Sequence, residues 1–162
     1  MISERDKKML DIKRANERIH AEQIAINNCK MAFETENKQL DYDLVLMGVL
    51  NLFKNDHFGF YLIAQQDEAV LASLMITYEW SDWRNALFWW IQSVYVLPSH
   101  REKGIYKKMY ERVWSMSRQS EVPVCGFRLY AESNNTTAHK AYINCGMEKC
   151  NYVMFEESKV IS

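Results

Sequence analysis

The chain has 162 residues, of which 48% are hydrophobic and 13% aromatic, so a single domain with a substantial core is expected over residues 1–162. Its 20 basic and 21 acidic residues leave a net charge of −1, which argues against a nucleic-acid-binding surface. No apolar run approaches the roughly 20 residues that a membrane span requires, and the N-terminus lacks the apolar stretch of a secretion signal.

Cysteine and histidine positions give no sign of a metal site or a disulfide framework. The cysteines Cys29, Cys125, Cys145 and Cys150 form no Cys-x-x-Cys pair, and the histidines show no metal-ligand spacing with them. Without a secretion signal, these cysteines are expected to be reduced thiols. The sequence therefore predicts a cytoplasmic protein without a metal.

Apolar periodicity predicts two helices near the N-terminus. Residues 1–18 are charged with mixed sign and fit either a flexible tail or a short first strand near residues 10–15. A helical pattern begins at Asn16 and is interrupted by the polar stretch 34–38, which we expect to be a loop. A second helix is predicted over residues 41–54.

A strand pair is expected next. The β-rich runs 60–64 and 70–78 flank the polar residues 65–68, a pattern typical of a hairpin. Residues 79–85 are predicted to form a second connection, which leads into a strand over residues 87–96.

The stretch that follows predicts a tight turn and a helix. The apolar run ends at Pro98, residues 99–104 are polar, and a 3.6-residue apolar period then extends to about residue 120. The first N–H groups of a helix have no partner inside the helix and carry the positive end of its dipole, so this turn is a candidate anion site. Gly104 has no Cβ and would let a phosphate approach the backbone closely.

The remaining chain predicts a strand over residues 124–131, a helix over 135–145 and a last strand over 148–156. The complete order is β-α-α-β-β-β-α-β-α-β. This order indicates a mixed α/β class with antiparallel hairpins first and βαβ crossovers later.

Residues 101–106 read Arg-Glu-Lys-Gly-Ile-Tyr and resemble the coenzyme A pyrophosphate loop of the GNAT family of N-acetyltransferases. The pattern of that loop is Gln/Arg-x-x-Gly-x-Gly/Ala, which Arg101 and Gly104 match. Tyr106 departs from it, because a small residue is usual there. Since the loop binds mainly through backbone amides, the departure affects the fit of the cofactor more than its binding.

A second segment, residues 134–147, is similar to the other cofactor segment of this family, Asn-x-x-Ala-x-x-x-Tyr-x-x-x-Gly-Phe/Met. The matching residues are Asn135, Ala138, Tyr142, Gly146 and Met147. Without the first motif, the same residues would fit an ordinary capped amphipathic helix. Together with that motif, they favour the family resemblance.

The resemblance implies a mostly antiparallel central sheet with helices on both faces and a V-shaped splay between the central strands. Acetyl-CoA would lie in the splay. The residues implied to bind it are Val94, Tyr95 and Val96 at the strand end, Arg101, Glu102, Lys103, Gly104, Ile105 and Tyr106 in the loop, and Asn135.

The resemblance also implies that Tyr142 protonates the departing thiolate, a role that suits a hydroxyl with one proton to donate. A backbone N–H near Tyr95 or Val96 could stabilise the oxyanion. The bland alternative for Tyr142 is core packing.

The general base is less well defined by the sequence. Related polyamine-type enzymes carry acidic residues where this chain has Gln92 and Ser93. The acidic candidates for the acceptor site are therefore Glu34 and Glu36, in the expected loop, and Glu79 and Asp82. The aromatic residues Trp80 and Trp83 between the last two could hold a cationic amine by cation–π attraction, or could simply pack a hairpin end.

These features predict an acetyl-CoA-dependent N-acetyltransferase that acts on the primary amine of a small molecule, without nucleic-acid or membrane partners. A protein or peptide N-acetyltransferase and a catalytically silent acyl-CoA-binding protein are the alternatives. Homodimers are frequent in the family, but no sequence feature locates an interface.

Overall fold

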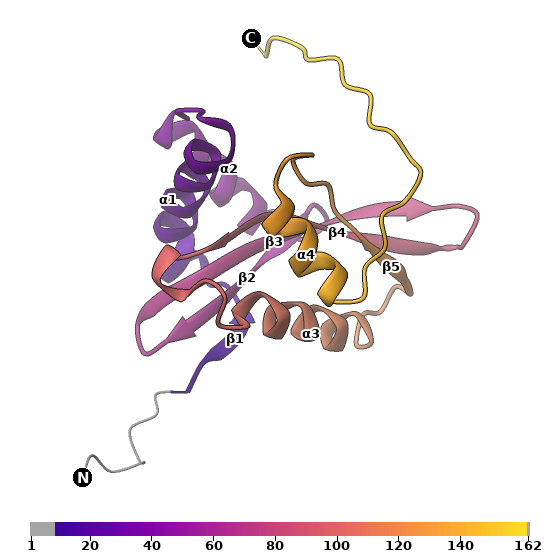
Figure 1. The fold of residues 1–162 in the computed structure, drawn as a ribbon, viewed down its shortest axis with the longest axis horizontal. Coiled ribbons are helices and arrows are strands. Elements are labelled where there is room, and N and C mark those ends of the chain that lie inside the picture. The colour runs from indigo at the N-terminus through magenta and orange to yellow at the C-terminus, as the bar shows by residue number, and fades with distance from the viewer. Residues whose placement is uncertain (1–8, 162) are drawn as a thin grey trace.

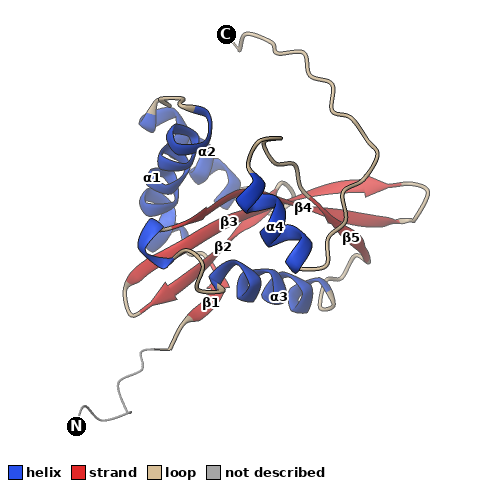
Figure 2. Ribbon diagram, viewed as in Figure 1, coloured by secondary structure: helices blue, strands red, loops and turns tan. Residues whose placement is uncertain are grey.

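The computed structural model describes residues 9–161, so residues 1–8, the start of the segment that fitted either a tail or a first strand, lie outside the described residues. Figures 1 and 2 show a single sheet with helices packed against both of its faces. In chain order the elements are β1 (Asp11–Arg14), α1 (Glu17–Glu36), α2 (Tyr42–Phe53), β2 (Gly59–Gln66), β3 (Ala69–Ser81), β4 (Ala86–Val96), the 3₁₀ turn η2 (Pro98–His100), α3 (Ile105–Ser117), β5 (Val124–Arg128) and α4 (Thr136–Asn144).

The sheet has the strand order β1-β2-β3-β4-β5. The first four strands are antiparallel neighbours, whereas β5 runs parallel to β4. This parallel pairing starts at Leu87 and ends where Trp90 faces Arg128. The strand β4 continues to Val96, which faces Ala72 of β3. The last residues of β4 therefore have a strand on one side only, which confirms the expected splay.

The alternation of side chains along β2 separates two apolar cores. Tyr61 and Ile63 point to the face covered by α1 and α2, and all three elements contribute buried residues to that core. Leu62 points to the opposite face, where it packs with α3 residues such as Met109 and Val113. Helices thus cover both faces of the sheet. This packing fixes the positions of α1 and α3 relative to the end of β4.

A β-bulge bends β4 just before its free end. Tyr95 faces Ser73 but Gln92 faces Met75, so two residues of β4 oppose one residue of β3. Ser93, inside this bulge, has a φ of 51°, which non-glycine residues seldom adopt. The bulge therefore lies at the point where β4 and β5 part.

Three sequence-based boundaries are wrong. Helix α1 continues to Glu36 and ends at Asn37, whose left-handed φ of 52° lets its N–H bond back to the helix, so residues 34–36 are helical. The β3–β4 hairpin stays paired as far as Ser81 and Ala86, so residues 79–81 are strand and not connection. The strand β5 stops at Arg128 instead of residue 131.

The predicted last strand over residues 148–156 is also wrong. This segment is extended and largely exposed, and none of it belongs to a strand. A β pattern becomes a strand only when its backbone groups pair with a neighbour, and β5 pairs only with β4 within residues 9–161.

Candidate active site

A cavity of about 1040 Å³ lies at the free end of β4. Its wall combines the last turns of α1, residues 94–96 of β4, the turn before α3 together with the first turn of that helix, and most of α4. Eleven residues were predicted either to bind the cofactor or, for Tyr142, to act as the acid. Ten of them line this one cavity, namely Val94, Tyr95, Val96, Arg101, Glu102, Gly104, Ile105, Tyr106, Asn135 and Tyr142. The fold thus brings two sequence motifs and a strand end together.

The backbone of β4 presents hydrogen-bonding groups to the side that β5 has left. The N–H of Leu97 donates to the carbonyl of Leu71 on β3 at 2.9 Å. Because main-chain groups of successive residues in a strand point to opposite sides, the N–H and C=O of Val96 point away from β3. Its carbonyl accepts a hydrogen bond from Arg101 Nε at 2.9 Å. The N–H of Val96, more than that of Tyr95, therefore faces the cleft.

The N-terminus of α3 is open to the cavity. Lys108 donates the first intrahelical hydrogen bond, to the carbonyl of Gly104 at 3.1 Å, so the amides of Ile105, Tyr106 and Lys107 have no partner within the helix. No side chain caps the helix. Gly104 has a φ of 74°, and no heavy atom beyond its chain neighbours lies within 4 Å of the place a Cβ would take. Free amides, helix dipole and open space together fit an anion such as a pyrophosphate.

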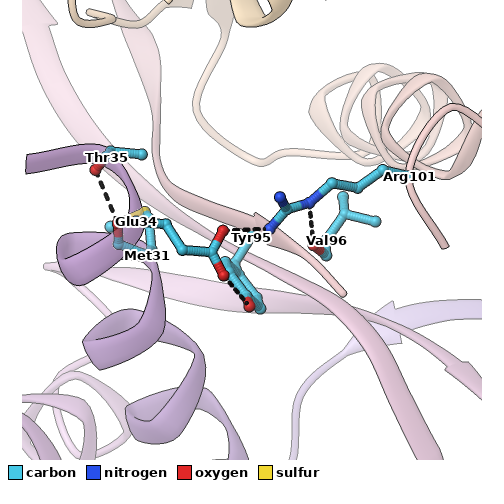
Figure 3. Close-up of polar contacts among 6 residues, drawn as sticks. All are labelled: Met31, Glu34, Thr35, Tyr95, Val96 and Arg101. Atoms are coloured by element: carbon cyan, nitrogen blue, oxygen red, sulfur yellow. Dashed lines mark hydrogen bonds and ion pairs between the residues drawn. The ribbon is translucent and has the colours of Figure 1, made fainter. Parts of the chain in front are cut away.

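Three side chains that line the cavity form a polar network (Figure 3). Arg101 Nη2 lies 2.5 Å from Glu34 Oε2, and the Tyr95 hydroxyl donates to Glu34 Oε1 at 2.9 Å. Burial opposes the charge of Glu34, but the hydrogen bonds from Arg101 and Tyr95 and nearby positive charge outweigh it, so the pKa of Glu34 lies below its ordinary 4.5. Glu34 is therefore a paired carboxylate with both oxygens engaged.

Tyrosine rings line the opposite wall. Asn135 caps α4 by accepting a hydrogen bond from the N–H of Ala138 at 3.1 Å, and Tyr142 follows two turns later. Burial raises the pKa of Tyr142 above its ordinary 10.0, so its hydroxyl stays protonated at neutral pH. The ring of Tyr106 meets it edge to face, with centroids 5.4 Å apart. The unusual Tyr106 of the loop therefore fills the space between α3 and α4.

Comparison with known proteins decides what kind of site this is. The model of the acetyltransferase (GNAT) family matches residues 20–147. The chain belongs to the GNAT family. It is therefore an acyltransferase, as the motifs predicted.

Solved structures agree with this assignment. A possible acetyltransferase from Clostridium difficile 630 is 37% identical, with a TM-score of 0.85 over 94% of this chain and 99% of that chain. A predicted acetyltransferase from Clostridium acetobutylicum, solved with acetyl-CoA, is 14% identical, with a TM-score of 0.75 over 92% and 96% of the two chains. AAC(6')-Iy, solved with a bisubstrate analogue, CoA-S-monomethyl-acetylneamine, is 18% identical, with a TM-score of 0.70 over 94% and 99%. The chain has no match among curated proteins.

Several residues predicted for this GNAT site lie away from the cavity. Lys103 follows the turn but points its amine to the carbonyl of Ser99 at 2.7 Å. Glu36 pairs with Lys38, at the end of α1. The remaining four, Glu79, Trp80, Asp82 and Trp83, lie on the β3–β4 hairpin and do not line the cavity. Their role in acceptor binding stays a prediction without support from the cavity.

Other cavity residues were missed by the sequence reasoning. Met31 and Thr35 of α1 line it, and Glu132 lines it from the segment after β5. Lys107 and Lys140 add positive charge on α3 and α4. Lys140 lies inside the recognised segment 134–147 and Lys107 directly follows the segment 101–106, so their charge was a usable signal, whereas the α1 residues carry no motif.

Residues 9–161 include no group of His, Cys, Asp and Glu side chains suited to a metal ion. In the same range, no helix has the length and apolarity needed to span a membrane.

Proposed function

We propose that this GNAT enzyme transfers an acetyl group from acetyl-CoA to the primary amine of a small molecule. One observation carries the proposal: the open end of β4, the uncapped N-terminus of α3 and Tyr142 line the same cavity. A concave cavity near 1040 Å³ can enclose a nucleotide cofactor arm together with a small acceptor.

The residues of the cavity fit acetyl-CoA. The amides at the start of α3, with Gly104 beside them, would hold the pyrophosphate, and the nearby Lys107 and Lys140 would balance its charge. The free edge of β4 at Val94 and Val96 would pair with the amides of the pantetheine arm. When bound, acetyl-CoA supplies the thioester carbonyl that the amine attacks.

The chain itself would supply a hydrogen-bond donor and an acid. The N–H of Val96, facing the cleft, can donate to the carbonyl oxygen as negative charge develops on it. Tyr142 can donate its proton to the departing sulfur, and its raised pKa keeps that proton in place until it is needed.

The amine must lose its proton, and the central strand offers no carboxylate for this task. Gln92 is engaged with Thr77 through a hydrogen bond of 3.1 Å, and Ser93 forms the bulge. Glu34, Glu102 and Glu132 are the carboxylates on the cavity wall. A base among them would act through water, and an amine that arrives neutral would need none.

The experiment that tests this function measures thiol release from acetyl-CoA with polyamines, amino acids, aminoglycosides and short peptides. We expect turnover with one class of small amine and a loss of at least tenfold in kcat for Tyr142→Phe. Tyr130→Phe is the matched control, because Tyr130 is exposed and lies outside the cavity. Turnover with peptides alone would refute the small-molecule acceptor, and full activity of Tyr142→Phe would refute its role as acid.

A further inference from the structure

We propose that Glu34 is a positioning residue for the cofactor loop, acting through Arg101, and is not an anchor for the acceptor amine. The inference rests on the proposed function, because it assigns a role toward acetyl-CoA. Glu34 and Arg101 are 67 positions apart in sequence, and Figure 3 shows their side chains meeting from the end of α1 and from the segment after β4.

The first step of the argument is that Arg101 is held at three places. Its Nη2 contacts Glu34 at 2.5 Å, its Nε donates to the carbonyl of Val96 at 2.9 Å, and its guanidinium carbon lies 5.4 Å from the centre of the Tyr95 ring. A planar fork can satisfy a carboxylate and a carbonyl at once. An exposed ion pair by itself contributes little, but several contacts on one guanidinium fix its geometry.

The second step concerns what this geometry holds. Arg101 is the residue at which η2 ends, and Gly104, three positions later, is the N-cap of α3. The bond to Val96 closes the segment between β4 and α3 onto the end of the strand. Glu34 fixes the same side chain to the last turn of α1. The loop backbone is therefore ordered before a cofactor arrives, which lowers the entropic cost of binding it.

The third step is that both oxygens of Glu34 are already engaged by other side chains of the protein. Arg101 contacts one of them and Tyr95 the other. Its charge is balanced by the guanidinium, so an incoming ammonium would gain little without displacing Arg101. Displacement would also release the Val96 carbonyl and thereby loosen the loop. The geometry consequently favours a cofactor role for Glu34.

Calorimetric titration with coenzyme A alone tests this inference, because it requires neither acceptor nor chemistry. We expect Glu34→Gln and Arg101→Lys each to weaken coenzyme A binding about tenfold, and the double variant to be no weaker than twice either single variant. Asp11→Asn is the control: it breaks an exposed ion pair with Lys13, 2.8 Å long, outside the cavity and should leave the affinity unchanged. Thermal melts identify any variant that fails to fold.

Kinetics then separate the two roles of Glu34. A cofactor role predicts a raised KM for acetyl-CoA, with the KM for the amine and kcat at saturating donor within twofold of wild type. A raised KM for the amine with unchanged coenzyme A affinity would overturn the inference. Tighter coenzyme A binding by Glu34→Gln would also overturn it, since Glu34 would then be withholding Arg101 from the phosphates. Weaker binding by the variants together with no turnover on any amine would support the inference while refuting the proposed function.

Discussion

Substitution of Gly104 by alanine tests the assignment of the α3 N-terminus as a phosphate site. Gly104 has a φ of 74°, where an L-residue is less stable than glycine by about 1 kcal/mol. No neighbouring atom within 4 Å would clash with the new methyl group, so strain of the backbone is the whole cost to the fold. For a chain of this length, that cost lowers Tm by about 2–4 °C.

The effect on acetyl-CoA should be larger than the effect on stability. The methyl group would project into the space through which a phosphate reaches the free amides. Loss of a single hydrogen bond to a charged group costs about 1.5–3 kcal/mol, which corresponds to a rise in Kd of roughly 10- to 150-fold. Calorimetric titration with coenzyme A measures this directly.

Gly146→Ala is the matched control. Gly146 has a φ of 88°, also has no heavy atom within 4 Å of its Cβ position, and does not line the cavity. It should show the same fall in Tm and an unchanged affinity. If Gly104→Ala lost stability as the control does and kept wild-type affinity for coenzyme A, the pyrophosphate would not be bound at this helix.

Three further outcomes follow from the structure. The pKa of Glu34 is lowered in the folded state, so its ionised form stabilises the protein at pH values above the ordinary pKa of 4.5. The difference in the free energy of unfolding between wild type and Glu34→Gln, measured with urea, should be constant near neutral pH. It should vanish as the pH falls through the folded-state pKa. Met109→Ala empties a fully buried site between α3 and the sheet and should lower the free energy of unfolding by about 2–5 kcal/mol; a loss below 1 kcal/mol would contradict the packing described. Asn135→Ala and Asn16→Ala each remove a helix N-cap and should cost about 1 kcal/mol, but only Asn135→Ala should raise the KM for acetyl-CoA; an equal rise in both would show a global effect.

Local sequence was sufficient where the structure depends on neighbouring residues. The turn after β4, the free amides of α3 and the cap of α4 are each built within a few consecutive residues. The motifs around Gly104 and Asn135 therefore predicted both their conformations and their presence at one site. The sequence also showed that Tyr106 departs from the motif, but it did not show that the Tyr106 ring contacts the ring of Tyr142.

The remaining features depend on contacts between distant parts of the chain. The apolar pattern over residues 148–156 predicted a strand. These residues pair with no strand among residues 9–161, and a strand requires a neighbour for its backbone hydrogen bonds. The hairpin residues Glu79 and Trp83 carry suitable chemistry, yet the length of β3 takes them away from the cavity.

By itself, the sequence determined the family and predicted the candidate cofactor segments and Tyr142 as the candidate acid, because these follow from short motifs with fixed local geometry. Only the tertiary structure decided which edge of β4 is open, since that depends on where β5 stops pairing. It also decided the partner of Glu34. The packing of α1 against one face of the sheet brings the end of this helix to Arg101, which is 67 positions later in the sequence. Side-chain pairing across such a distance in sequence is set by packing, and no local pattern encodes it.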